Sequence, residues 1–349
     1  MSAKKTLDQK LQAIHADPYG CKEFIIADAK DADMGYGIAA PGPQRDSCPH
    51  GYNKTEGCFK TLADYLEQTR AVIRQEIVDI VLLSASNLER LAIKERLFDG
   101  SPITPAARAN DTSDIWIVRG GKYTRLPSRP FRSATIDHIK YGQIVSDHTR
   151  PALGADLGLY SVTFTNDIER DWQTLDEFYD FRIEAEKKNF RYFLEVFNPN
   201  VDPGFDSRKV GAFLNDHIIR ALAGVTEKGR PIFLKIPYNG PGPLEELVAY
   251  DPHIVVGILG GGAGTTMDAF QQIYEARKHG ARVALYSRKI NYSEYPLAFI
   301  EFLRRIVDDQ ILPADAVKAY HDVLHKEKIR PLRSLQADLQ RTQTLQNYG

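Results

Sequence analysis

The chain of 349 residues has few of the features that mark a disulfide scaffold, a membrane protein or a nucleic-acid-binding protein. Its three cysteines are too few for a disulfide framework. No apolar run approaches the roughly 20 residues that are needed to cross a bilayer. The 45 basic and 46 acidic residues leave a formal net charge of −1, so we expect no electrostatic attraction to nucleic acid or to a membrane surface.

The N-terminal residues 1–12 are polar and contain lysine, with no apolar core after them, so we expect no secretory signal. A content of 43% hydrophobic and 26% charged residues is typical of folded proteins. These features predict a soluble, cytoplasmic protein. We expect one domain over 1–349, with an N-terminal extension at 1–20 and a helical tail at 313–349.

Short apolar runs alternate with longer helical patterns from residue 24 onward. These runs are apolar on both faces, as parallel strands are when helices cover one side and a packed interior covers the other. Eight βα units in this length predict an α/β protein, a (β/α)8 barrel with additional C-terminal helices. The predicted strands are Phe24–Asp28, Ile80–Ser84, Ile115–Val118, Tyr160–Thr165, Tyr192–Phe197, Ile232–Ile236, Ile254–Leu259 and Arg282–Tyr286.

Polar residues at the carboxyl ends of barrel strands face the active site of such a fold, so these positions are the first candidates. The first strand ends at Asp28, with Lys30 behind it, and the third ends at Arg119. Glu195 lies inside the fifth strand and Lys235 inside the sixth. Long connections at 39–55 and 120–150 are expected to be substrate loops or lids at the same end.

Lys235 stands in an otherwise apolar strand, where an ammonium group is costly unless it is paired or neutral. Desolvation favours the neutral amine, which is the nucleophile that forms a Schiff base with a carbonyl. The alternative is a structural lysine paired with an interior carboxylate. Glu195 could be a general acid–base or only the ion-pair partner, and both interpretations predict a contact between these two side chains.

The seventh strand is followed by a glycine run that includes Gly260, Gly261 and Gly262, just before a predicted helix. Glycines allow close approach to the backbone, and free N–H groups at a helix N-terminus attract anions. After the eighth strand, Ser287 and Arg288 add a hydroxyl and a bidentate donor. Because barrels commonly bind phosphate with these two loops, the sequence predicts an anion site there.

The last four βα units, Tyr192–Val307, resemble the class I (Schiff-base) aldolases of the (β/α)8 type, which include the deoxyribose-phosphate, archaeal-type fructose-bisphosphate and tagatose-bisphosphate aldolases. Residues 234–240, Leu-Lys-Ile-Pro-Tyr-Asn-Gly, resemble the Lys-x-x-Tyr-Thr-Gly segment that carries the Schiff-base lysine. Residues 259–261 resemble the Ser-Gly-Gly phosphate loop, and residues 287–288 resemble the Gly-Arg after the last strand. Residues 193–195, Phe-Leu-Glu, resemble the fifth-strand Leu-Glu of the tagatose-bisphosphate enzymes.

The resemblance implies an aldehyde-lyase, a metal-independent class I aldolase without a cofactor. It would cleave or form a C–C bond of a phosphorylated or otherwise anionic sugar, and it would assemble as a homo-oligomer. The resemblance makes Lys235 the nucleophile, with Glu195 and Asp28 in proton transfer. Lys30 or Arg119 would hold a second anionic group.

The sequence departs from the resemblance at several positions, among them Ser287 in place of the glycine after the last strand and the residues that follow Asp28. Archaeal-type enzymes carry a catalytic tyrosine near the end of the fifth strand, where this chain has Phe197. Either Glu195 or Tyr238 would then transfer the proton, and Tyr238 is also expected to contact the substrate.

Two other functions remain open. A phosphosugar isomerase or epimerase on the same barrel would use Asp28 and Glu195 as an acid–base pair, with Lys235 only electrostatic. A non-catalytic barrel would bind a sugar phosphate or a protein partner.

Two further groups of residues are weaker candidates. Cys48, His50 and Cys58 share a loop, but their spacing is not that of a standard zinc site, so we expect incidental thiols rather than a metal. His138 and His148 flank the third unit and are interpreted as surface or loop histidines.

Overall fold

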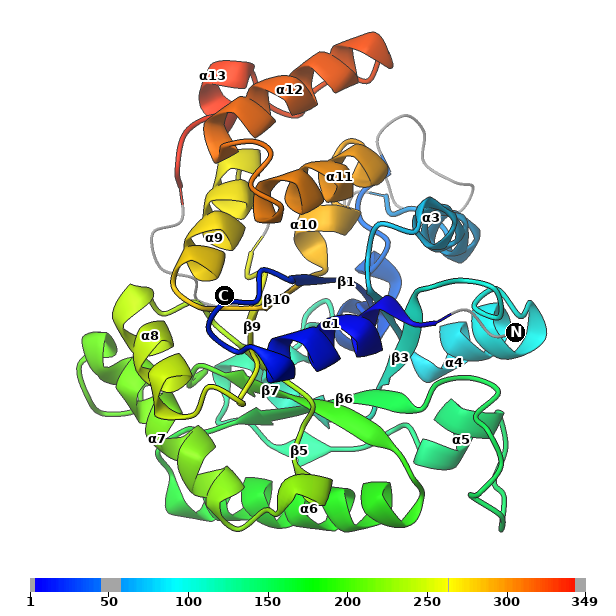
Figure 1. Ribbon diagram of the computed structural model, residues 1–349, viewed down its shortest axis with the longest axis vertical. Helices are drawn as coiled ribbons and strands as arrows, with labels where there is room; N and C mark the ends of the chain where they lie inside the picture. Colours follow the sequence, from blue (N-terminus) through cyan, green and yellow to red (C-terminus); the bar gives the residue numbers. More distant parts are fainter. Residues whose placement is uncertain (1–3, 45–57, 263, 343–349) are drawn as a thin grey trace.

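The computed structural model describes residues 4–44, 58–262 and 264–342. Within these residues, eight parallel strands form a closed barrel in the order β1-β10-β9-β8-β7-β6-β3-β2, and helices surround it (Figure 1). This is the predicted (β/α)8 barrel. The barrel strands are β1 (Ile25–Lys30), β2 (Ile80–Leu83), β3 (Thr104–Arg108), β6 (Leu157–Thr163), β7 (Arg191–Phe197), β8 (Leu234–Ile236), β9 (Val256–Leu259) and β10 (Val283–Tyr286).

Some helices, such as α3, begin at a capping residue and bury an apolar face. Thr61 and Asp64 make a reciprocal capping box before α3, whose buried face includes Tyr65 and Val72. No helix of the described residues has the length and apolar character that crossing a membrane requires. The helices are α1 (Thr6–Ala16), α2 (Asp33–Tyr36), α3 (Leu62–Gln75), α4 (Ala85–Leu88), α5 (Ile136–Tyr141), α6 (Ile168–Lys187), α7 (Val210–Ala223), α8 (Pro241–Tyr250), α9 (Thr266–Lys278), α10 (Arg288–Asn291), α11 (Pro296–Val307), α12 (Pro313–Lys326) and α13 (Leu335–Asp338).

Helix α1 closes the end of the barrel at which the strands begin. Its buried residues Leu7, Leu11 and Ile14 belong to the same apolar cluster as the inward-facing Ile25 and Phe193. Figure 1 shows α1 lying across this end of the barrel. The predicted extension at 1–20 therefore contains a helix that completes the barrel core, and a ligand must enter from the opposite end.

The prediction of the third strand was wrong. β3 is Thr104–Arg108, and the predicted Ile115–Val118 begins at the last residue of a short 3-10 helix (Ser113–Ile115) in the connection after it. The true strand is rich in small residues, which lack the β-branched pattern that marks most strands, and it contains a proline. Arg119, which was expected at the end of this strand, is exposed in that connection.

The connection between β3 and β6 folds back over the open end of the barrel. Strands β4 (Asp111–Thr112) and β5 (Pro130–Phe131) pair within it, and the side chain of Asn200 donates hydrogen bonds to the carbonyl oxygens of Thr124 and Leu126. The backbone N–H of Ile117 donates to the carbonyl oxygen of Gly35 at 2.8 Å. The connection is thus tied to the loops of two other βα units.

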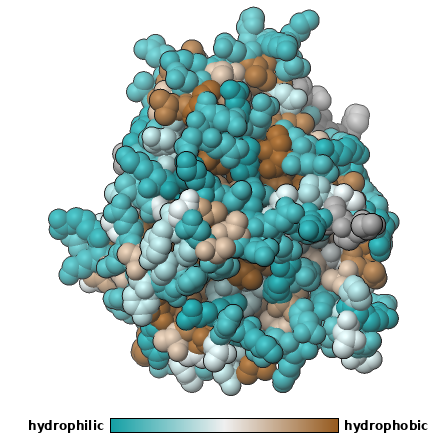
Figure 2. All heavy atoms as spheres, viewed as in Figure 1, coloured by the Kyte–Doolittle hydropathy of each residue, from teal (hydrophilic) through white to brown (hydrophobic). Residues whose placement is uncertain are grey.

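The C-terminal helices pack on the outside of the barrel. Helices α11 and α12 both pack against α9 (Figure 1). Phe299, Phe302 and Ile306 of α11 are buried within the chain, so the apolar content of this helix is explained by intramolecular packing. The closed end of the molecule is mostly hydrophilic, with only separate apolar areas (Figure 2). The homo-oligomer stays a prediction.

Candidate active site

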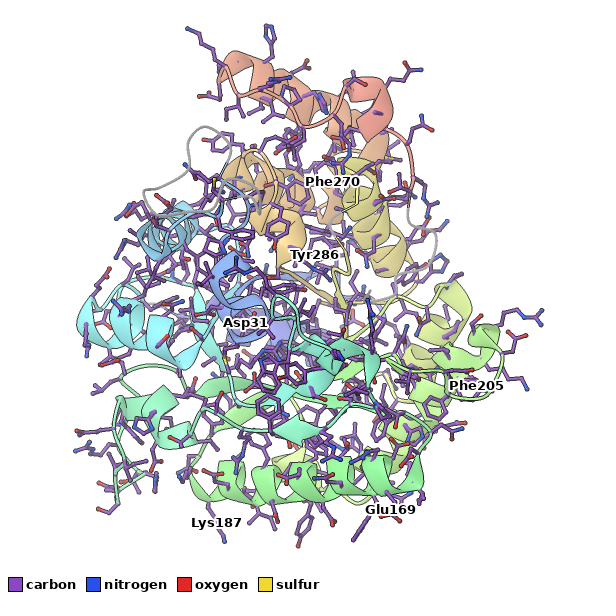
Figure 3. All side chains as sticks on the ribbon, turned by 180° about the vertical axis from the view of Figure 1, so that it is seen from behind. Asp31, Glu169, Lys187, Phe205, Phe270 and Tyr286 are labelled. Carbon is purple, nitrogen blue, oxygen red and sulfur yellow. The ribbon has the colours of Figure 1, made fainter. Side chains whose placement is uncertain are left out.

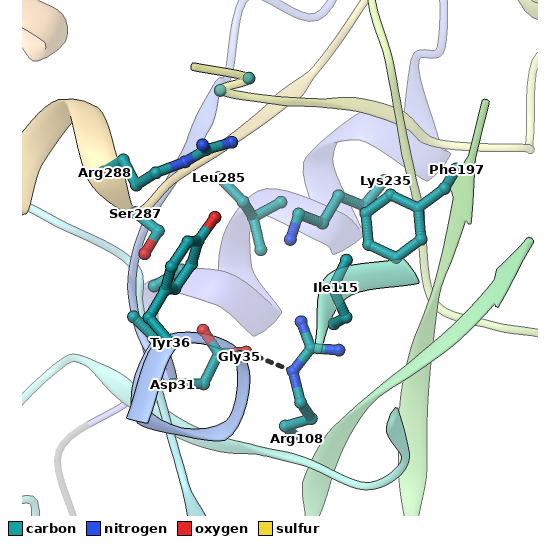
Figure 4. Close-up of a pocket in the computed structure, with 14 residues that line it drawn as sticks. Asp31, Gly35, Tyr36, Arg108, Ile115, Phe197, Lys235, Leu285, Ser287 and Arg288 are labelled. Atoms are coloured by element: carbon teal, nitrogen blue, oxygen red, sulfur yellow. Dashed lines mark hydrogen bonds and ion pairs between the residues drawn. The ribbon is translucent and has the colours of Figure 1, made fainter. Parts of the chain in front are cut away.

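A pocket opens at the carboxyl ends of the barrel strands. Seen from this end, Asp31 lies near the middle of the molecule, whereas Glu169 and Lys187 lie at its rim (Figure 3). The residues that line the pocket come from the ends of barrel strands and from the loops that follow them (Figure 4): Ala29, Asp31, Ala32, Gly35, Tyr36, Arg108, Ile115, Phe197, Lys235, Gly260, Gly261, Leu285, Ser287 and Arg288.

Lys235 and Glu195 meet inside this end of the barrel. Phe233, just before β8, belongs to the interior cluster, while Leu234 and Ile236 of β8 belong to the outer one, so strand alternation turns Lys235 inward. The Nζ atom of Lys235 lies 2.5 Å from Oε1 of Glu195, and the exposed fractions of these side chains are 6% and 0%. The predicted contact between the two residues is confirmed.

The register of the sheet explains this contact. Four residues are partners side by side across β6, β7, β8 and β9: Ser161, Glu195, Lys235 and Gly257. The hydroxyl of Ser161 donates to Oε2 of Glu195 at 2.7 Å. A Cβ atom at Gly257 would lie 2.7 Å from the carbonyl oxygen of Leu234, so only glycine fits beside the lysine.

Arg108 links two carboxylates of the site. Its Nε donates to Oδ2 of Asp31 at 2.6 Å, and its Nη2 lies 3.4 Å from Oε2 of Glu195. Its Nη1 donates to the hydroxyl of Ser161 at 3.0 Å. Burial disfavours the guanidinium charge, but Asp31, Glu195 and Asp111 outweigh burial and raise the pKa of Arg108. The arginine therefore stays charged and fixes both acids.

The structure brings Asp31 into the pocket and leaves Asp28 outside it. On β1, Ile25, Ala27 and Ala29 face the barrel interior, so the alternate residue Asp28 faces the helices. β1 also extends two residues beyond its predicted end, to Lys30. The interior carboxylate of this strand end is therefore Asp31, and the assignment of Asp28 to the site is corrected.

Lys30 shares the outward face with Asp28, and their charged atoms lie 3.2 Å apart. The Lys30 amine also donates to the side-chain oxygens of Gln68 on α3, at 2.9 Å, and of Asn291 on α10. Burial raises the pKa of Asp28 and lowers the pKa of Lys30, and each partner opposes the shift of the other. Lys30 is therefore a structural residue between barrel and helices, and it does not line the pocket.

Asp33 begins α2, close to the pocket. Its Oδ2 accepts from the hydroxyl of Ser84 at 2.7 Å and from the side-chain amide of Asn87 at 3.0 Å. Burial raises the pKa of Asp33 to about 6, and nearby Asp31 adds to this effect while Ser84 opposes it. This carboxyl group can therefore change its charge near neutral pH.

The other half of the pocket has the features of an anion site. Gly260, Gly261, Ser287 and Arg288 all line it, as the sequence predicted. The Arg288 guanidinium lies 5.5 Å from the centre of the Tyr36 ring, in a cation–π arrangement that fixes its direction. Gly261 has a φ of 66°, a conformation that glycine adopts without strain.

Besides Lys30 and Arg119, two more residues predicted to bind substrate are not among those that line the pocket. Gly262 is half-buried in the loop after β9. Tyr238 packs against the outer hydrophobic cluster, and burial, together with nearby Glu275 and Glu245, raises its pKa to about 12. Tyr238 is thus poorly placed to transfer a proton. Phe197, unlike Tyr238, lines the pocket.

The N–H groups at the start of α9 are already bonded within the chain, contrary to the prediction that they attract an anion. The N–H of Thr265 donates to Asp268 at 2.8 Å, and the N–H of Asp268 donates to the hydroxyl of Thr265 at 3.1 Å. The N–H of Thr266 donates to Asp338 at 2.8 Å. An anion in the pocket must therefore be held by the glycine loop, the start of α10 and Arg288.

Cys58, His138 and His148 are not among the residues that line the pocket. Cys48 and His50 fall outside the described residues, and Cys58 is disulfide-bonded, which corrects the expectation that the thiols are incidental. Over 4–44, 58–262 and 264–342, no group of three or more His, Cys, Asp or Glu side chains could hold a metal ion. His138 is an exposed residue of α5 that contacts Thr135 at 2.6 Å, and His148 lies in the loop after α5 and contacts Asp137 at 2.9 Å.

Sequence reasoning missed Arg108 and Ser161. Arg108 ends a run of small residues, and such a run with one terminal charge could have marked a strand that leads into the site. Ser161 carries no local signal. Its role follows only from its register beside Glu195.

Comparison with known proteins adds information on the fold. No protein-family model and no curated protein matches this chain. A solved Schiff base-forming fructose-1,6-bisphosphate aldolase is similar, with a TM-score of 0.59 and 15% identity over 85% of this chain and 99% of the aldolase. The Corynebacterium glutamicum (Brevibacterium flavum) protein Cgl0159 is similar with a TM-score of 0.55 and 16% identity, over 89% of this chain and all of that one. At these identities the likeness shows the (β/α)8 fold alone.

Proposed function

We propose that this protein is a class I aldolase that cleaves or forms a C–C bond of an anionic sugar through a Schiff base on Lys235. The observation that carries the proposal is the position of one amine. Lys235 is buried and lines the same pocket as Gly260, Gly261 and Arg288, and its Nζ lies 2.5 Å from a carboxylate oxygen of Glu195. This arrangement would supply a nucleophile and an anion site in one cavity, with a proton acceptor in contact with the nucleophile.

The first steps need proton transfer at a single nitrogen. Glu195 takes a proton from the Lys235 ammonium, and the free amine adds to the substrate carbonyl to give a carbinolamine. Protonated Glu195 then returns the proton to the carbinolamine hydroxyl, which leaves as water and forms the iminium. The buried carboxylate at 2.5 Å supports this step because it can exchange a proton with the amine directly.

The C–C bond then breaks toward the iminium nitrogen. A carboxylate takes the proton of the hydroxyl on the carbon that becomes the aldehyde, the bonding electrons form an enamine, and the aldehyde leaves. Asp31 is the best candidate for this base because it lines the pocket and is oriented by Arg108. Protonation of the enamine carbon and hydrolysis by water release the second product and restore the amine.

The anion would be held by the backbone of Gly260 and Gly261 and by Ser287 and Arg288. An arginine that stacks on Tyr36 loses little conformational freedom on binding, which favours a bidentate contact with phosphate or sulfonate. Binding energy from this remote group would orient the carbonyl toward Lys235.

One observation favours a second candidate, a phosphosugar isomerase or epimerase. The close Lys235–Glu195 contact suits a permanent ion pair, in which the lysine stays an ammonium and a carboxylate removes a carbon-bound proton. This reaction needs the anion site but forms no covalent intermediate.

Borohydride trapping distinguishes the two candidates because it reduces an iminium to a stable secondary amine. Intact mass is measured after borohydride treatment with a panel of phosphorylated and sulfonated ketoses. The aldolase proposal expects a mass increase of one reduced substrate in the wild type and none in Lys235→Met. Lys289→Gln is the matched control, because burial lowers the pKa of Lys289 to about 8 and this amine also lies near the mouth of the barrel. Labelling that persists in Lys235→Met would refute the assignment of the nucleophile.

A further inference from the structure

The C-terminal segment 334–342 is bonded to the start of α9, next to the proposed anion loop. Oδ1 of Asp338 accepts from the N–H of Thr266 at 2.8 Å, and its Oδ2 lies 3.0 Å from Nε2 of His321 on α12. The Asp338 side chain is 4% exposed. A carboxylate from the end of the chain thus occupies the N-terminus of the helix that follows the glycine loop.

A second set of hydrogen bonds joins segment 334–342 to the first turn of α9. The N–H and hydroxyl of Thr342 donate to the two oxygens of Asp268, at 2.8 and 2.6 Å. The hydroxyl of Thr265 donates to the carbonyl oxygen of Gln340 at 2.7 Å. Both Asp268 and Thr265 are buried. Segment 334–342 therefore contacts Thr265, Thr266 and Asp268 at the start of α9.

These contacts restrain the loop between β9 and α9, which would bind the anion. Gly261 and Gly264 both have positive φ angles, 66° and 57°, so the loop is built from residues that could adopt many other conformations. A Cβ at Gly264 would lie 2.6 Å from Oδ2 of Asp268, so the backbone passes directly against this anchored carboxylate. Without the anchor, the glycines would gain freedom that anion binding must remove again.

We propose that the C-terminal segment 334–342 positions the anion-binding loop between β9 and α9, and that Asp338 is the positioning residue at its centre. The proposal rests on the proposed function only in assigning an anion to this loop. The alternative is that Asp338 inhibits anion binding. If Asp338 instead competed with the anion for the N–H of Thr266, its removal would strengthen anion binding. The two roles predict effects of opposite sign.

The test measures the affinity of the full chain for inorganic phosphate by titration calorimetry. We expect Asp338→Ala to bind phosphate about tenfold more weakly, because it leaves the buried N–H of Thr266 without its acceptor and releases the loop. Asp338→Asn retains an oxygen acceptor and should recover most of the affinity. Arg341→Ala is the matched control. Arg341 lies on the same segment but contacts Glu275 in the body of α9, so its removal should leave the affinity unchanged.

A second variant guards against misfolding as the cause. Thr342→Val removes only the hydroxyl that donates to Asp268 and should weaken phosphate binding about threefold with an unchanged circular dichroism spectrum. Unchanged or stronger binding in Asp338→Ala would overturn the proposal, and so would a wild type that binds no phosphate. Trapping of Lys235 with the uncharged ketone dihydroxyacetone tests the proposed function separately, because it does not need the anion loop.

Discussion

Glu195 and Lys235 are direct neighbours across β7 and β8, and their side chains meet at 2.5 Å in the barrel interior. The register of the two strands puts them at the same height, and strand alternation turns both inward. Glu195 is held from the other side by Ser161 at 2.7 Å, so its carboxylate is fixed before a substrate arrives.

Replacing Glu195 with glutamine keeps the shape of the side chain and removes its ability to take a proton. We expect borohydride labelling of Lys235 to slow by about 10²-fold, because general acid–base catalysis contributes about 10² to 10⁴ in rate. The measurement is the labelling rate by intact mass at saturating ketose. A rate within about threefold of the wild type would show that the amine loses its proton by another route.

Replacing each of the two aspartates near the end of β1 should affect turnover differently. Asp31→Asn changes a carboxylate that lines the pocket, and we expect retro-aldol turnover of the ketose that labels Lys235 to fall by about 10²-fold. Asp28→Asn changes a residue that faces the helices and should leave this turnover within about threefold of the wild type. Equal losses in the two variants would contradict the inward and outward assignments.

Arg108 should matter for stability far more than Arg119. Arg108→Met leaves Asp31 and Glu195 as buried carboxylates without their shared cation, which should lower the free energy of unfolding by about 3 kcal/mol. Arg119→Ala changes an exposed residue and should lower it by no more than about 0.5 kcal/mol. Urea unfolding of both variants checks the comparison. A loss in Arg119→Ala as large as that in Arg108→Met would contradict the exposed position of Arg119.

The raised pKa of Asp33 predicts a pH dependence of stability. Its pKa is about 6 in the folded protein, against an ordinary value of 3.8, so the folded state binds the proton more tightly. The stabilising contribution is complete below pH 3.8 and is lost as the pH rises through about 6. Relative to Asp33→Asn, the wild type should therefore lose about 2 kcal/mol of unfolding free energy between pH 4 and pH 7.5. Parallel urea titrations at the two pH values measure this difference, and a constant difference would contradict it.

The barrel and the Lys235–Glu195 contact could be predicted because both depend on local pattern. Parallel strands buried on both faces read as apolar runs, and a charge inside such a run must meet a partner. β3 was not predicted because Thr104–Arg108 consists mostly of small residues, which do not form an apolar run. The more apolar Ile115 run instead forms part of the connection over the mouth, where Ile115 lines the pocket.

The first strand shows why the direction of a single side chain is hard to predict from the sequence. Strand alternation reverses the direction of a side chain with each position, so an error of one residue exchanges inside and outside. Asp28 and Asp31 are both acidic and close in sequence, and only the observed register separates them. The anchoring of α9 by Asp338 joins residues about 70 positions apart and has no local signal.

The most direct measurement of the central claim is the location of the reduced adduct. Wild-type protein is treated with borohydride and the ketose that gives the largest mass increase, and the labelled residue is then identified by tandem mass spectrometry of its peptides. The aldolase account predicts the label on Lys235, and its loss in Lys235→Met but not in Lys289→Gln. A label on any other lysine, or no label with any ketose of the panel while phosphate still binds, would contradict it.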